Sequence, residues 1–168
     1  KLYAEFGLPL GMLGGLLLAL RSLDALVDPL LGRWSDRLPS RYAGCLIAAM
    51  ALLAGMTMLL NPAAAIVDLW TWLTVALLLV YAGFSLATIA YGAWGAELPP
   101  DSASRTTLTT SREAVGLAGV LVAAALPSVL GSSNATGLSR FAWVFAAALV
   151  TGLLLLRPIR LARNDAAT

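Results

Sequence analysis

Three charged residues lie within one apolar stretch of this chain: Arg21, Asp24 and Asp28. At about 100° per residue of an α-helix, Asp24 lies about 60° and Asp28 about 20° from Arg21 around the helix axis. The three side chains therefore form one polar stripe. A charge at the centre of a membrane costs about 2.5–3.5 kcal/mol on insertion scales, so such a stripe must face a protein interior or a water-filled cavity.

Arg21 can neutralise only one of the two carboxylates, and the other then needs a proton or a cation. Two carboxylates one helical turn apart can hold a proton or share a monovalent metal ion such as Na⁺. Pro29 has no N–H to donate to the carbonyl of Ala25, which frees a backbone oxygen in the same turn. The pattern predicts a site for H⁺ or Na⁺ at Asp24 and Asp28. The alternative is a buried Arg–Asp ion pair that only fixes helix packing.

The composition indicates which solvent surrounds the chain. Of 168 residues, 60% are hydrophobic and 12% charged, and the mean hydropathy is +0.84. Soluble domains carry about 25% charged residues, so we expect an all-α integral membrane protein. The net charge of +2 is spread along the chain, which argues against nucleic acid as a partner. The sequence contains no His, the commonest catalytic base, and we expect neither an enzyme nor a cofactor.

Five apolar stretches are long enough to cross a membrane, which takes about 20 residues. They span roughly 8–31, 43–60, 69–98, 107–130 and 138–156, with turn-forming residues between them. Arginines gather after the first, third and fifth spans, so this side and the C-terminus should be cytoplasmic. The N-terminus would then lie outside, and we expect a preceding helix upstream of Lys1. Residues 164–168 are predicted to be a cytoplasmic tail or the start of a linker.

Two further polar stripes follow helical spacing. The stripe of the third span comprises Tyr81, Ser85, Thr88, Gly92 and Gly95. The stripe of the fourth span comprises Thr109, Arg112, Gly116, Gly119 and Ala123. Hydroxyls and glycines suit either close helix packing or the wall of a substrate cavity, and packing is the simpler interpretation for the third span. Arg112 can reach the aspartate pair, bind a substrate oxygen, or extend to the membrane interface.

Two segments resemble a known family of transporters. The run Leu20–Arg37 contains Arg-x-x-Asp-Ala-x-x-Asp-Pro-x-x-Gly, which resembles the second helix of the glycoside–pentoside–hexuronide:cation symporters. These melibiose permease-like proteins are major facilitators, and relatives carry lysolipids. Gly32–Arg37 also resembles the Gly-x-x-x-Asp-Arg loop of major facilitators, and Ile89–Leu98 the end of the family's fourth helix.

The resemblance implies that residues 1–163 form helices 2–6 of an N-terminal six-helix bundle. The first helix and a second six-helix bundle would be the missing partners. It implies cation ligands at Asp24, Asp28 and Ser85, and a gating loop with Gly32, Asp36 and Arg37. We expect the substrate side to comprise Arg21, Tyr81, Thr88, Gly92 and Arg112.

Two departures from the family pattern bear on the ligands. Val27 stands where sodium-using members have an amide, which tilts the choice toward H⁺. Thr88 and Gly92 replace the sugar-binding acid and the aromatic platform of melibiose permease, which argues against a galactoside.

The expected function is therefore cation- or proton-coupled symport of a small, sugar-like solute by alternating access in a bacterial inner (plasma) membrane. A lipid or lysolipid transporter of the same fold is the alternative, with membrane lipid as a further partner. Membrane-embedded phosphatidyltransferases also bind metals through aspartates on helices. They need Asp-Gly and Ala-Arg neighbours, whereas this chain has Asp24-Ala25 and Asp28-Pro29. A purely structural membrane subunit would tolerate neutralisation of both aspartates.

Overall fold

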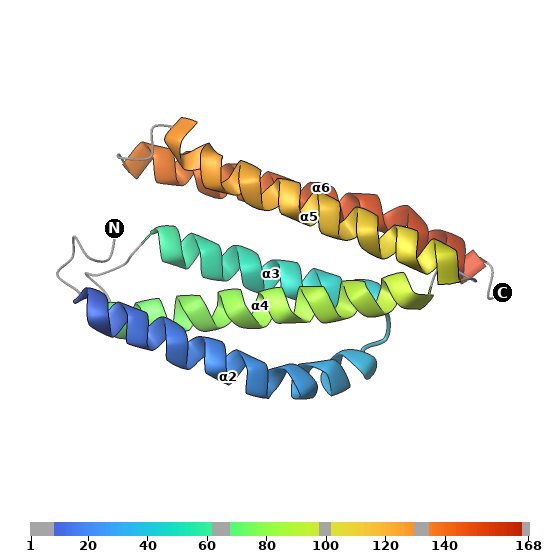
Figure 1. Cartoon of the computed structure of the whole chain (residues 1–168), viewed down its shortest axis with the longest axis horizontal. Coiled ribbons are helices and arrows are strands. Elements are labelled where there is room, and N and C mark those ends of the chain that lie inside the picture. Colours follow the sequence, from blue (N-terminus) through green and yellow to red (C-terminus); the bar gives the residue numbers. More distant parts are fainter. Residues whose placement is uncertain (1–8, 62–67, 98–101, 130–134, 166–168) are drawn as a thin grey trace.

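The computed structural model describes residues 9–61, 68–97, 102–129 and 135–165. These ranges hold five helices: α2 (Leu10–Asp36), α3 (Arg41–Leu60), α4 (Leu69–Glu97), α5 (Ser102–Val129) and α6 (Ala135–Asp165). Each helix runs antiparallel to the one before it (Figure 1). The C-terminal ends of α2, α4 and α6 therefore lie at one end of the bundle, as the alternating spans predict.

The prediction of an all-α membrane protein with five helices is confirmed. Four helices contain segments long and apolar enough to cross a membrane: Arg41–Leu60, Leu69–Ala96, Thr106–Leu126 and Arg140–Arg157. The helix with the three-charge stripe, α2, is not among these four. It continues past residue 31 to Asp36, and α6 continues past residue 156 to Asp165. The predicted span limits at residues 8, 98 and 130 lie outside the described residues.

Local hydrogen bonds fix where two of the helices begin. Ser40 precedes α3, and its Oγ accepts a hydrogen bond from the backbone N–H of Ala43 at 3.1 Å. Asp68 does the same for α4 by accepting from the N–H of Thr71 at 3.1 Å. Such caps satisfy backbone donors that have no partner within the helix. Pro29 lies inside α2, which bends along its length (Figure 1).

The closest packing in the bundle joins α3 to α4 through glycines. A Cβ atom added at Gly55 would lie 2.8 Å from the backbone nitrogen of Val80 and 2.9 Å from the carbonyl oxygen of Ala76. One added at Gly83 would lie 2.9 Å from the backbone nitrogen of Leu52. Only a residue without a side chain allows the two backbones to approach this closely. Small residues serve this purpose in membrane helices because lipid gives no hydrophobic drive for association.

The remaining helices pack around this pair. In one view, α2 lies on one side of α3 and α4, and α5 and α6 lie together on the other (Figure 1). The buried side chains of Leu20, Leu73 and Leu77 join α2 to α4. Contacts also link α3 to α6, and α5 touches both α4 and α6. The charged stripe of α2 thus meets part of the polar stripe of α4, at Ser85.

The α3–α4 contact predicts an asymmetric response to glycine substitution. Gly83→Val is expected to lower the free energy of unfolding by about 1–3 kcal/mol, because the new side chain collides with the α3 backbone. Gly119→Val in α5 is the matched control, since a Cβ there meets nothing within 4 Å. Thermal unfolding of both variants in detergent measures the difference. Equal melting temperatures would contradict the close packing.

Candidate functional site

The centre of the site is Asp24 on α2, a buried carboxylate with 7% of its surface exposed. Its Oδ1 atom accepts a hydrogen bond from the Ser85 hydroxyl of α4 at 2.9 Å. Its Oδ2 atom accepts from Nη1 of Arg21, one turn earlier on α2, at 3.1 Å. Both oxygens of Asp24 thus have a donor, and one of the two donors carries a positive charge. The ion pair expected between Arg21 and one of the aspartates is formed with Asp24.

An apolar cluster sets the geometry of this contact. Leu20, one turn before Asp24, is buried against Leu73 and Leu77 of α4. The face of α2 that carries Leu20 and Asp24 is therefore turned toward α4. On α4, Ser85 lies two turns beyond Leu77 on the same face, so its hydroxyl meets the carboxylate. The hydrophobic contact positions the polar one.

Asp28 has a different environment from Asp24, although it lies only one turn further along α2. It is half-buried, and its enclosed Oδ1 atom has no hydrogen-bond partner. Within the described ranges, no three His, Cys, Asp or Glu side chains come together as a metal site. A cation here would depend on the Asp24 and Asp28 carboxylates, the Ser85 hydroxyl and backbone oxygens. A proton would need only the free oxygen of Asp28.

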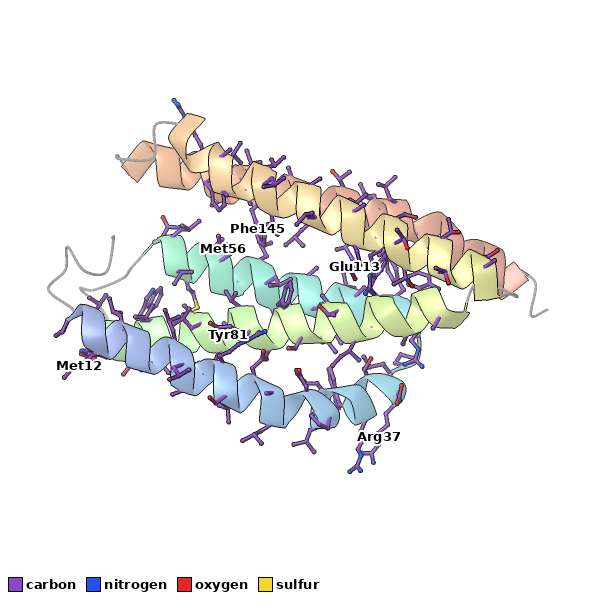
Figure 2. All side chains as sticks on the ribbon, in the orientation of Figure 1. Met12, Arg37, Met56, Tyr81, Glu113 and Phe145 are labelled. Atoms are coloured by element: carbon purple, nitrogen blue, oxygen red, sulfur yellow. The ribbon has the colours of Figure 1, made fainter. Side chains whose placement is uncertain are left out.

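The α4 residues predicted for the substrate side share one polar stripe, but this stripe meets different helices along its length. Tyr81 is half-buried and packs on the leucine cluster that faces α2, whereas Thr88 is exposed. Gly92 faces α5, because a Cβ added there would lie 3.4 Å from Nη1 of Arg112. Figure 2 labels Tyr81 on α4, near α2, and Glu113 on α5. The polar stripe of α4 therefore serves two interfaces.

Sequence reasoning did not single out Glu113 as a site residue. Nη2 of Arg112 lies 2.8 Å from Oε1 of Glu113 in an ion pair on α5. Arg112 is half-buried and Glu113 is exposed. The signal was present, because an adjacent Arg and Glu are unusual within an apolar span. The structure brings Arg112 to Glu113 and Gly92, and the described contacts do not join it to the aspartate pair.

The family of the chain can now be stated. A family model described as MFS/sugar transport protein matches residues 2–163, nearly the whole chain. The chain belongs to this family of the major facilitator superfamily. Comparisons with the curated proteins and with the solved structures give no match. Membership makes the protein a membrane transporter by class, and charges on its membrane helices are then expected to serve a transport path.

The corner between α2 and α3 of this major facilitator chain contains the predicted gating loop. Asp36, the last residue of α2, pairs with Arg41 at the start of α3, with 2.7 Å between Oδ1 and Nη1. Arg37 is exposed and its backbone N–H donates to the carbonyl of Trp34, which ends the helix. A Cβ added at Gly32 meets nothing within 4 Å. The ion pair braces the corner, and Gly32 leaves open space beside it.

The Asp24–Ser85 contact predicts a specific loss of stability. Ser85→Ala removes the one α4 donor to a buried carboxylate and should lower the free energy of unfolding by about 1.5–3 kcal/mol. Thr88→Ala is the matched control, because this hydroxyl lies on the same helix but is exposed. Thermal unfolding in detergent separates the two variants. A Ser85→Ala protein as stable as the control would contradict the contact.

Proposed function

We propose that the protein is a secondary active transporter that couples symport of a small, sugar-like solute to H⁺ or Na⁺ by alternating access. Membership of the MFS/sugar transport protein family supplies the transport class. The observation that carries the coupling is the enclosed, unpartnered Oδ1 atom of Asp28. Asp28 lies one turn after Asp24, whose two carboxylate oxygens already accept hydrogen bonds from Arg21 and Ser85.

A count of charges supports Asp28 as the coupling group. Arg21 contributes one positive charge and the two aspartates contribute two negative charges, so one negative charge is left over. Arg21 and Ser85 are both engaged by Asp24, which leaves Asp28 as the carboxylate without a donor. An unpaired charge that is partly withdrawn from water is strongly unfavourable. Binding of H⁺ or Na⁺ at Asp28 removes this penalty.

The choice between Na⁺ and H⁺ depends on the oxygen ligands that the site can offer. Na⁺ would require Asp24, Asp28, Ser85 and the carbonyl oxygen of Ala25 to converge, whereas a proton requires only Asp28. Val27 lies in the same turn and adds no polar atom. We therefore favour H⁺ as the coupling ion.

We propose that α4 connects ion binding to solute binding. It contacts α2 through Ser85 and faces α5 through Gly92, two turns further along. Arg112 lies at this second contact, where its guanidinium can bind a solute hydroxyl, and Thr88 lies between the two contacts along the helix. Loading of Asp28 would change the α2–α4 contact and shift α4 relative to α5. The ion and the solute would then raise one another's affinity reciprocally.

The proposal includes the surroundings of the chain. We place it in the bacterial inner membrane, with the C-terminal ends of α2, α4 and α6 in the cytoplasm, because arginines gather at or after these ends. A helix before α2 and a second six-helix bundle would complete the transporter. The two bundles would rock about the solute site.

The test neutralises each aspartate in the full-length protein, reconstituted in vesicles. Asp28→Asn is expected to abolish sugar uptake driven by a pH or Na⁺ gradient, because the coupling charge is gone. Uptake of a panel of radiolabelled mono- and disaccharides measures this. Asp68→Asn is the control, since Asp68 is an exposed helix cap and Asn also caps helices. Gradient-driven uptake that survives in Asp28→Asn would refute the proposal.

A second readout does not depend on knowing the solute. Asp24→Asn should lower the free energy of unfolding by about 1–3 kcal/mol, since it removes a charged partner from Arg21 and Ser85. Asp28→Asn removes an unpartnered charge and should not lower it. For a Na⁺ site, the wild-type melting temperature should be higher in NaCl than in choline chloride, and this difference should disappear in Asp28→Asn. The reverse assignment would follow if only Asp24→Asn lost this difference.

A further inference from the structure

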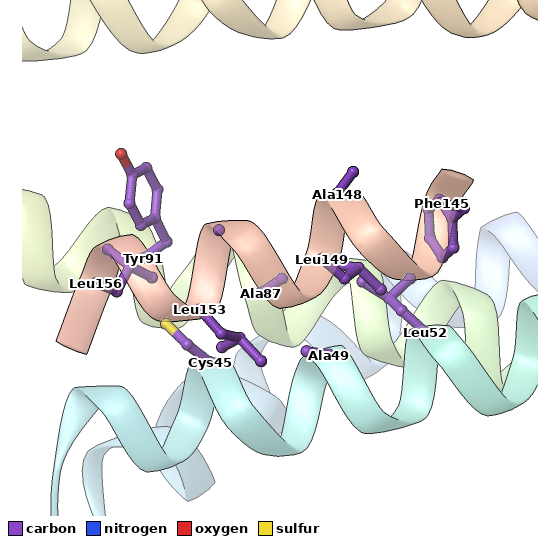
Figure 3. A pocket seen from close by; sticks show the side chains of 11 residues that line it. Cys45, Ala49, Leu52, Ala87, Tyr91, Phe145, Ala148, Leu149, Leu153 and Leu156 are labelled. Atoms are coloured by element: carbon purple, nitrogen blue, oxygen red, sulfur yellow. The ribbon is translucent and has the colours of Figure 1, made fainter. Parts of the chain in front are cut away.

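An elongated apolar pocket lies between α3, α4 and α6, apart from the charged site. Its volume is about 320 Å³. Its walls include Cys45 and Leu52 of α3, Ala87 of α4, and Phe145, Leu149 and Leu156 of α6. Figure 3 shows Leu156, Cys45 and Tyr91 at one end and Phe145 and Leu52 at the other. Asp24, Asp28 and Ser85 do not line it.

The pocket lies at the depth of the membrane. All of its lining residues fall within the apolar segments of α3, α4 and α6 that are able to cross a bilayer. The hydrocarbon core of a bilayer would surround the bundle at this level. Its polar groups are limited to the Tyr91 hydroxyl and the Cys45 thiol. A sugar would lose its hydrogen bonds to water and find almost none here, so the pocket suits an apolar ligand.

The length of the pocket suits a hydrocarbon chain. Phe145 and Leu156 are eleven residues apart on α6, which corresponds to about 16 Å along the helix axis. Such a length accommodates an extended stretch of hydrocarbon. A hydrocarbon chain that enters the pocket leaves one apolar medium for another. Its affinity therefore comes from van der Waals contacts with pocket walls that otherwise have no atoms packed against them.

A positively charged residue lies on α6 at the level of one end of the pocket, although it does not line the pocket. Arg157 directly follows Leu156, which lines that end, and Arg157 is exposed. Tyr91 lies at the same end, and such amphipathic rings favour the headgroup region of a bilayer. A phosphate group at this level would meet the guanidinium of Arg157. The opposite end, at Phe145, is apolar.

We propose that this pocket binds one acyl chain of an anionic phospholipid, whose phosphate pairs with Arg157. The apolar walls hold the chain and the arginine selects the charge of the headgroup. The bound lipid would fill the crevice between α6 and the α3–α4 pair. This proposal is independent of the ion-coupling site.

The test is native mass spectrometry of the full-length protein, delipidated in detergent and titrated with phosphatidylglycerol or phosphatidylcholine. The wild type should retain one phosphatidylglycerol more tightly than phosphatidylcholine. Arg157→Gln should weaken phosphatidylglycerol binding about fivefold and phosphatidylcholine binding by less, because the choline cation offsets the phosphate charge of phosphatidylcholine. Gly152→Phe should reduce the retention of both lipids to background.

Gly152 lines the pocket, and a Cβ added there meets nothing within 4 Å. The side chain of Gly152→Phe can therefore occupy the pocket without a collision at its Cβ. Gly116→Phe on α5 is the control. A Cβ added at Gly116 also meets nothing within 4 Å, but Gly116 does not line the pocket. Retention of phosphatidylglycerol that is unchanged in Gly152→Phe, or reduced equally in Gly116→Phe, would overturn the proposal. So would a loss of self-association in Gly152→Phe without a loss of lipid, because a second copy would then occupy the pocket.

Discussion

A carboxylate inside an apolar helix bundle must find donors, and the way Asp24 does so organises this protein. It takes one donor from its own helix, Arg21, and one from α4, Ser85. In a medium of low dielectric these charge-assisted hydrogen bonds are strong and their loss is costly. The contact therefore joins α2 to α4 at a fixed register. Neither of these two donors bonds to Asp28, whose enclosed Oδ1 atom has no partner.

The rest of the bundle holds α4 where this contact needs it. Glycines at the α3–α4 interface bring the two backbones together, and fully buried alanines fill the space between them: Ala48, Ala76 and Ala90. Dispersion contacts of this kind replace the hydrophobic drive that lipid does not supply. Packed against α3, α4 places Ser85 in contact with α2 and Gly92 beside Arg112 of α5. Its central place makes it the natural link between ion and solute in the proposed mechanism.

The bundle also separates two kinds of chemistry. Charged groups lie at the α2–α4 and α4–α5 interfaces, where Asp24, Asp28 and the Arg112–Glu113 pair are found. The crevice between α6 and the α3–α4 pair is apolar along its length. The outer surface of a major facilitator meets lipid, whereas charged groups on its membrane helices must face protein or water. The polar interfaces suit the ion and the solute, and the apolar crevice suits a lipid chain.

The five helices, their alternation and the charged stripe of α2 could be predicted from the amino-acid sequence alone. These properties are local, because they depend on the length of apolar runs and on the helical period. The stripe of α4 was also visible, but a stripe of hydroxyls and glycines looks the same whether it packs or binds. The packing of the helices was needed to show that Asp24 rather than Asp28 receives Arg21 and Ser85, and that Gly92 faces Arg112. A helix fixes which residues share a face, whereas the partner of that face depends on how the helices pack together.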